Sequence, residues 1–207
     1  MRQSTEIKEA SRLSFDRQAA AYDEAVYGGH ARKLYAPILG ALDGVPHRRL
    51  LDLGCGTGEL LKILLELGGN TACTGLDLSE NMLAVAREKL GERAQLVRGD
   101  AERLPFGDGS FDAVVCNDSF HHYPNPAAVV AEVERVLRPG GTFVLGDCRH
   151  AWPGRALINL FLRFSRGGDV KIYAEREIRA LLSARLGAVD YRVVNAHAFL
   201  ATGKKQR

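Results

Sequence analysis

The sequence predicts an α/β fold in which a mostly parallel seven-stranded sheet has helices on both faces and ends in an antiparallel hairpin. Apolar runs alternate with helical patterns from Leu50 to Asp147, which is typical of repeated β-α-β units. The run from Phe111 to Asn117 is almost continuously hydrophobic, as expected for a strand covered on both faces. Residues 188–204 alternate around Asn195-Ala196, which indicates the closing hairpin.

The composition is that of one globular domain. The chain has 207 residues, of which 46% are hydrophobic and 26% charged, and its net charge is +3. Its lysines and arginines are scattered, so a nucleic-acid surface is not indicated. The four cysteines form no C-x-x-C pair, and no stretch approaches the roughly 18 apolar residues of a membrane span. We expect a soluble, cytoplasmic protein with reduced thiols, no membrane span and no metal-ligand set; the oligomeric state is not indicated.

We expect the single domain, 1–207, to have four parts. Residues 1–47 form an N-terminal helical cap, split into two helices at Gly28-Gly29. Residues 48–148 form the core, and 151–173, in which apolar residues interleave with arginines, form a substrate lid. Residues 174–207 supply a closing helix and the hairpin. In the core, Ser79 and Asn125 are expected to cap helices that follow the second and fourth strands.

A glycine loop is the feature around which the chain is organised. An apolar run ends at Asp52, and glycines follow at alternate positions, Gly54, Gly56 and Gly58, before an apolar helical segment. Glycine lets a ligand approach the backbone and adopts positive φ at low cost. We expect the loop amides and the helix N-terminus to face an anionic group. The spacing is not the G-x-G-x-x-G of dinucleotide sites, and a structural turn would use similar glycines.

Further polar residues follow the next three strands at the same edge of the sheet. These are Asp77, Asp100 and Asn117. In parallel sheets, ligands bind beyond the carboxyl ends of the strands, and a carboxylate after the second strand is where ribose hydroxyls are recognised. A helix-entry acid at Asp77 would also fit. The convergence predicts a nucleotide-like cofactor site.

Five motifs, in order between residues 45 and 148, resemble those of class I S-adenosylmethionine-dependent methyltransferases, and most closely the quinone-biosynthesis C-methyltransferases. They are Asp-Leu-Gly-Cys-Gly-Thr-Gly at 52–58, Gly-Leu-Asp-Leu-Ser at 75–79, Gly-Asp-Ala-Glu-Arg-Leu-Pro-Phe at 99–106, Phe-Asp-Ala-Val-Val-Cys-Asn at 111–117 and Leu-Arg-Pro-Gly-Gly at 137–141. The resemblance implies a Rossmann-like three-layer sandwich, the cofactor S-adenosylmethionine, and a small-molecule methyl acceptor.

The resemblance also implies roles for individual residues. Gly54, Cys55 and Gly56 would face the methionine part and the sugar, and Asp52 would help to anchor the methionine end. Asp77 would accept the ribose hydroxyls.

The remaining roles concern adenine and the methionine ammonium. Leu78 and Met82 would flank adenine, and Asp100 with the Ala101 amide would read its edge. The Asn117 carbonyl would meet the ammonium group. Tyr22 resembles a tyrosine that closes over the cofactor, although a core aromatic would fit the same position.

Methyl transfer requires the protein to align a nucleophile, exclude water and, for some acceptors, remove a proton. Histidine suits the last task because its pKa lies near neutral pH. His121 and His122 follow the fourth strand and are the candidates, with His121 preferred. A structural role for either histidine is also consistent with the sequence.

Three alternatives remain. A nucleic-acid base methyltransferase usually has two prolines after the fourth strand, where this chain has Asn117-Asp118-Ser119-Phe120. A sensor could bind the cofactor without transferring methyl. A nicotinamide oxidoreductase is disfavoured by the loop spacing. The apolar residues and arginines of 151–173 suggest an apolar acceptor with an acidic group; its nucleophile, carbon, oxygen or nitrogen, is left open.

Overall fold

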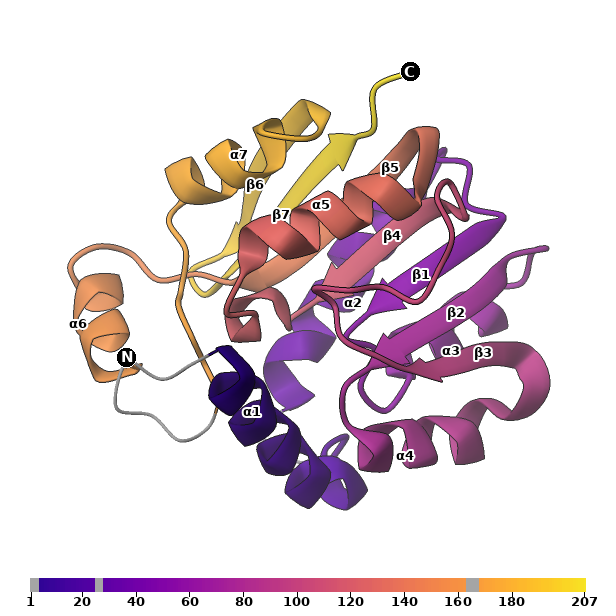
Figure 1. Cartoon of the computed structure of the whole chain (residues 1–207), viewed down its shortest axis with the longest axis horizontal. Coiled ribbons are helices and arrows are strands. Elements are labelled where there is room, and N and C mark those ends of the chain that lie inside the picture. Colours follow the sequence, from indigo (N-terminus) through magenta and orange to yellow (C-terminus); the bar gives the residue numbers. More distant parts are fainter. Residues whose placement is uncertain (1–3, 25–27, 163–167) are drawn as a thin grey trace.

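The computed structural model describes residues 4–24, 28–162 and 168–207, and its centre is a seven-stranded sheet of order β3-β2-β1-β4-β5-β7-β6 (Figure 1). Strands β1 to β5 pair in parallel, and β7 pairs antiparallel with both β5 and β6. The strands are β1 Arg49–Leu53, β2 Ala72–Asp77, β3 Ala94–Arg98, β4 Phe111–Asn117, β5 Leu137–Cys148, β6 Gly187–Asn195 and β7 Ala198–Lys204. The predicted sheet with its C-terminal hairpin is confirmed.

Helices cover both faces of the sheet, which gives three layers. One face packs against α2 Gly28–Leu42, α3 Glu59–Glu66 and α4 Glu80–Leu90, and the other against α5 Pro126–Val136 and α7 Glu175–Ser183. Neighbouring residues of β1 point to opposite faces: Leu50 belongs to the core under α2 and α3, and Leu51 to the core under α5 and α7. Both cores are apolar, as a doubly covered parallel sheet requires.

The helix caps are those that the sequence predicts. The Ser79 hydroxyl accepts a hydrogen bond from the Met82 amide at 3.1 Å, and the Asn125 side chain accepts one from the Ala128 amide at 3.3 Å. Pro126 occupies the first turn of α5. Each cap fixes where a helix begins beyond the carboxyl end of a strand, and therefore helps to place the loops there.

Two elements differ from the sequence prediction. Gly28-Gly29 does not separate two helices but begins the second, α2; the first helical stretch is α1 Ser4–Gln18 with the short helix η1 Ala19–Ala21. Strand β5 begins at Leu137, whereas the apolar run in the sequence predicts a strand over residues 142–147. The extended segment around Gly140 is possible because its backbone has partners: the Gly140 amide donates to the Lys205 carbonyl, and the Lys205 amide donates to the Gly141 carbonyl.

The stretch 151–173 contains one helix among its described residues, α6 Gly154–Leu162, which lies at the side of the molecule (Figure 1). Leu157, Leu160 and Phe161 on this helix are exposed. The Asn159 side chain ties it to the backbone N–H and carbonyl of Ile172. The short helices η2 Gly91–Arg93 and η3 Phe120–His122 complete the order of elements. In the described parts of the chain, no helix combines the length and apolarity needed to span a bilayer.

Candidate functional site

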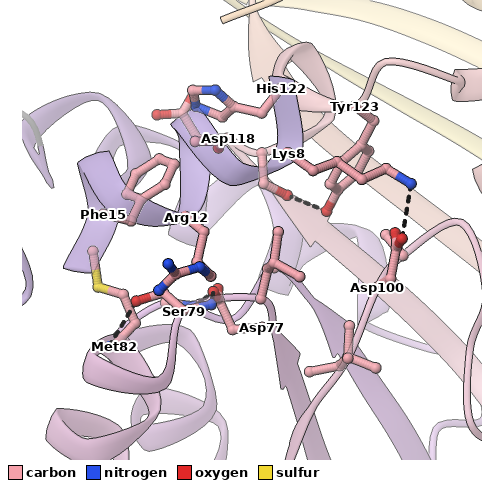
Figure 2. Close-up of a pocket in the computed structure, with 18 of the residues that line it drawn as sticks. Lys8, Arg12, Phe15, Asp77, Ser79, Met82, Asp100, Asp118, His122 and Tyr123 are labelled. Carbon is pink, nitrogen blue, oxygen red and sulfur yellow. Dashed lines mark hydrogen bonds and ion pairs between the residues drawn. The ribbon is translucent and has the colours of Figure 1, made fainter. Parts of the chain in front are cut away.

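A cavity with about 770 Å³ of empty space lies beyond the carboxyl ends of β1, β2, β3 and β4. Helix α1 covers it, and side chains from α1 reach toward the strand ends (Figure 2). We call it the first cavity. Of the residues that the sequence singled out, those that line it are Tyr22, Gly54, Gly56, Asp77, Leu78, Met82, Asp100, Ala101, Asn117 and His122. The predicted convergence of four strand ends on one site is therefore present.

Asp77 links the end of β2 to the glycine loop. Its carboxylate accepts hydrogen bonds from the Gly56 amide at 2.9 Å and from the Ser79 amide at 2.8 Å. Burial raises the pKa of Asp77, and these backbone donors act in the opposite direction. The carboxylate thus faces the cavity from a fixed position, with acceptor capacity remaining on both oxygens.

The three loop glycines meet different surroundings, although each has positive φ. A Cβ at Gly54 would lie 2.4 Å from the Ser119 hydroxyl oxygen, and one at Gly58 would lie 2.9 Å from Leu90. Apart from its chain neighbours, no atom of the described residues lies within 4 Å of the Cβ position of Gly56. Gly54 and Gly58 therefore satisfy internal packing, while Gly56 leaves space that opens to the cavity.

The expectation that the loop amides face an anionic ligand is largely wrong. The amides of Gly54 and Cys55 both donate to the Leu76 carbonyl, at 2.8 and 3.0 Å, and the Gly56 amide donates to Asp77. The Gly58 amide donates to the Cys55 carbonyl. These internal bonds hold the loop in shape, so it offers a ligand close backbone approach rather than a row of free donors.

Asp52 and Cys55 do not line the cavity but lie buried beside it. The Asp52 Oδ1 atom has no hydrogen-bond partner among the described residues. Burial, followed by the charge of Asp77, raises the pKa of Asp52 to about 7. Burial also raises the pKa of the Cys55 thiol.

At the end of β3, Asp100 is held by α1. Lys8 donates to the Asp100 carboxylate at 2.8 Å and to Glu102 at 2.7 Å, and the Asp100 carboxylate also accepts from the Glu102 amide (Figure 2). A second tie joins α1 to the N-terminus of α4, where the Ser79 hydroxyl donates to Asp16 at 2.6 Å. Polar contacts thus hold the helix over the cavity.

At the end of β4, Asn117 and Asp118 form another part of the wall. Asn117 Oδ1 is buried and has no partner in the described structure. Asp118 adopts a left-handed backbone conformation, with φ 53°, and its carboxylate lies 2.7 Å from His30 Nδ1. Hydrogen bonding to Asp118 raises the pKa of His30, against the effect of burial. A strained non-glycine residue held by a charged partner is typical of a functional site.

The predicted histidines lie where the first cavity meets a second one, which has about 1010 Å³ of empty space. Phe15, Tyr22, Asp118 and His122 line both cavities, and His121 lines only the second. The Phe15 ring contacts the His122 ring edge to face at 5.0 Å.

The two histidines have different electrostatic environments. Burial alone would lower the pKa of His121, but the charge of Asp147, whose Oδ1 lies 2.6 Å from His121 Nδ1, raises it well above its usual value. Burial and the charge of His121 lower the pKa of His122. Burial raises the pKa of Tyr22 to about 12, so its hydroxyl stays protonated at neutral pH.

Several cavity residues were missed by the sequence reasoning, and four of them come from α1. Lys8, Ser11, Arg12 and Phe15 all line the first cavity. Their spacing of three, one and three residues places them on one face of a helix, a signal that was available in the sequence.

By contrast, no residue of α6 lines either of the two cavities, and Asp169 is the one residue of the described part of 151–173 that lines the second. The assignment of 151–173 as a substrate lid stays a prediction.

Comparison with known proteins agrees with the fold. Residues 51–145 match the family described as "Methyltransferase domain". A ubiquinone/menaquinone biosynthesis C-methyltransferase from Methylobacterium nodulans is 37% identical over 144 residues, which cover 66% of this chain and 57% of that protein. The chain spans about half the length of the curated relatives it matches.

Two solved structures show the same fold at low sequence identity. A chain from the complex of the Haloferax volcanii Trm112 methyltransferase activator with a methyltransferase has TM-score 0.80 and 22% identity, covering 95% of this chain and 98% of its own. The 1,6-didemethyltoxoflavin-N1-methyltransferase of Burkholderia thailandensis, solved with bound 1,6-didemethyltoxoflavin and S-adenosylhomocysteine, has TM-score 0.76 and 23% identity, covering 100% of this chain and 92% of its own.

The strand order and the layers of this chain are therefore those of solved Rossmann-like methyltransferases. Residues 51–145 are similar to the methyltransferase-domain family, and the chain resembles the quinone-biosynthesis C-methyltransferases.

Proposed function

We propose that the protein transfers a methyl group from S-adenosylmethionine to a small-molecule acceptor. The observation that carries this proposal is the meeting of the four strand ends, with Gly56, Asp77, Asp100 and Asn117, on one covered cavity. The mixture of apolar walls with a few fixed polar groups suits a nucleoside-like ligand. The relatives described above, including one solved with S-adenosylhomocysteine, support the same cofactor.

The cavity residues fit the parts of this cofactor. Asp77 would bind the ribose hydroxyls, Leu78 and Met82 would pack on adenine, and Asp100 with the Ala101 amide would bind its edge. Lys8 already pairs with the Asp100 carboxylate, so a ligand that binds Asp100 would share this carboxylate with Lys8.

The methionine end would lie toward β1 and β4. The unpartnered Asn117 Oδ1 and the Asn117 carbonyl are suited to its ammonium group, and Asp52, buried beside the cavity, would add an acidic group behind this wall. Gly54 and Gly56 would let the methionine part of the cofactor lie close to the protein backbone. Tyr22 would close the first cavity where it meets the second cavity. When bound, the cofactor supplies a methyl group already activated by the sulfonium; the protein's task is alignment and exclusion of water.

We assign the second cavity to the acceptor. It shares a boundary with the cofactor cavity at Phe15, Tyr22, Asp118 and His122, where a nucleophile could face the methyl group. The rings of Phe15 and Tyr22 could pack against an apolar ring, and Arg17 could pair with an acidic group. His121 and His122 would help to remove a proton from the acceptor. Of the two, His122 lies nearer to the proposed cofactor because it lines both cavities.

Cofactor binding and methyl transfer are tested separately. Calorimetry with S-adenosylhomocysteine should show one site per chain, and Asp77→Asn should weaken binding about tenfold or more, because a charged hydrogen bond to a hydroxyl contributes roughly 1.5–3 kcal/mol. The exposed Asp190→Asn is the matched control and should bind as the wild type does.

For transfer, metabolite extracts are incubated with methyl-labelled donor and the protein, and mass spectrometry should detect a labelled product. Replacement of His121 and His122 by alanine should reduce its yield while cofactor binding remains. Binding without any labelled product would support the sensor alternative. Labelling of RNA, with retention that depends on salt, would support the nucleic-acid alternative. We also propose a cytoplasmic location, which four free thiols support.

A further inference from the structure

Three side chains with metal-binding atoms meet at the wall of the second cavity. The Asp169 Oδ1 atom lies 3.2 Å from His122 Nδ1 and 3.6 Å from His121 Nε2, and all three atoms lie within 4.8 Å of one another. We propose that His121, His122 and Asp169 bind one divalent transition-metal ion of the zinc type. The inference rests on the proposed function and deepens it, because it says how the acceptor is activated.

The spacing fits a tetrahedral ion. Zinc lies about 2.0–2.2 Å from nitrogen and oxygen ligands, so neighbouring ligand atoms in a tetrahedral site are about 3.3–3.6 Å apart. The distances from Asp169 Oδ1 to the two histidine nitrogens, 3.2 and 3.6 Å, are close to this range. Two imidazoles and one carboxylate favour such an ion over magnesium or calcium, which prefer oxygen ligands.

The histidines are also arranged as ligands. His121 Nδ1 lies 2.6 Å from Asp147 Oδ1, and Asp147 Oδ2 accepts the His121 amide at 3.0 Å. A carboxylate on one ring nitrogen orients the other nitrogen toward a metal, a common arrangement around metal-binding histidines. The His122 Nδ1 atom is buried and lies 3.2 Å from Asp169 Oδ1, so it points into the cluster and not toward solvent.

Three protein ligands leave a fourth position for a molecule in the second cavity, as in catalytic zinc sites. There an acceptor O–H or N–H group would coordinate, and its proton would pass to solvent because the ion lowers its pKa. The heteroatom would then form a bond to the methyl carbon while the carbon–sulfur bond breaks, leaving a thioether. The ion is neither oxidised nor reduced.

A second set, His121, Asp147 and Cys148, also lies within 4.8 Å. It is the weaker candidate because Asp147 Oδ1 is already used twice, by His121 Nδ1 and by the Cys148 amide. The two sets share only His121. Substitutions at Asp169 and Cys148 therefore distinguish them.

The test is equilibrium dialysis of the full chain against Zn²⁺, followed by metal analysis. We expect about one ion per chain in the wild type, and at least tenfold weaker binding in Asp169→Asn and in His122→Ala. The Asp169 side chain is 37% exposed, so its asparagine variant should fold. Asp190→Asn is the control, with binding equal to that of the wild type. Uptake well below one ion, or undiminished uptake by Asp169→Asn, would overturn the proposal.

Co²⁺ spectra give a second readout. Visible bands of a nitrogen and oxygen site, without a sulfur-to-cobalt band in the near ultraviolet, are expected, and they should be unchanged in Cys148→Ser. A sulfur band would place the ion at the other set and refute the proposal. Calorimetry of metal-free protein with S-adenosylhomocysteine separates the two proposals: intact cofactor binding without metal uptake would refute the metal site alone.

Discussion

Asp52 is a buried carboxyl whose ionisation should destabilise the ligand-free protein. Its pKa of about 7 in the fold exceeds the value of about 3.9 in an unfolded chain, so the folded state binds the proton more tightly. Its contribution to stability is therefore complete below about pH 4 and is lost as the pH rises toward 7. We predict that Asp52→Asn increases the free energy of unfolding at pH 8, by on the order of 1–3 kcal/mol, and by less at pH 5.

Urea unfolding of the ligand-free variant and wild type at both pH values measures this effect. The exposed Asp190→Asn should show no gain that grows with pH. An Asp52→Asn variant that is equally or less stable than the wild type at pH 8 would show that the buried carboxylate has a compensating partner. The same variant should bind S-adenosylhomocysteine more weakly, which would explain why an unfavourable charge is kept beside the site.

At the residue scale, the sequence identified most of the cavity because glycines and acids mark strand ends. It could not separate the reasons for the three glycines. A side chain at Gly54 would collide with Ser119, and one at Gly58 would collide with Leu90. Both of these neighbours are distant in the chain. It also could not find His30, which contacts Asp118 across 88 positions. Such pairings depend on how the sheet is ordered, not on any local pattern.

Helix α1 is the element that covers the cofactor cavity, and its ion pairs should control ligand release. Lys8 joins it to Asp100 and Glu102, and these partly buried pairs contribute roughly 1 kcal/mol. We predict that Lys8→Ala increases the dissociation rate of S-adenosylhomocysteine about fivefold, with little change in its association rate. Displacement of labelled ligand by excess unlabelled ligand measures the rate. The exposed Lys33→Ala on α2 serves as the control, and equal rates for Lys8→Ala and wild type would contradict a covering role.

At the element scale, the sequence predicted the core well and the periphery less well. Caps at Ser79 and Asn125 and the apolar strands are local signals, and they were confirmed. The role of α1 was missed although its cavity-facing residues share one helix face, because these residues are polar or aromatic and the apolar stripe of the helix is weak. The apolar character of 151–173 suggested a lid, but on α6 Leu157 and Phe161 are exposed, which the pattern alone could not indicate.

At the scale of the whole molecule, alternation of strands and helices predicts a parallel sheet but not its order. The position of β4 beside β1, which brings Asn117 next to the glycine loop, follows from a crossover that no single segment specifies. The resemblance of the motifs implied a Rossmann-like sandwich, and the structure supplies the strand order. The cavity is consequently a property of the assembled sheet: four strand ends and one covering helix meet only in the folded chain.

Because the cavity exists only in the folded chain, ligand binding should increase the stability of the fold. A ligand that binds only the folded chain, at a concentration of 100 times its Kd, stabilises by about 2.7 kcal/mol, which for a chain of this size raises Tm by about 5–10 °C. S-adenosylhomocysteine should produce this shift, and hydrogen exchange should show new protection in α1 and in the loop from Gly54 to Gly58, which lie on opposite sides of the cavity. Asp77→Asn, measured at the same ligand concentration, should show a smaller shift, and Asp190→Asn an unchanged one. A full Tm shift with protection confined to α6 or the hairpin would mean that the ligand binds elsewhere, and the assignment of the cavity would be wrong.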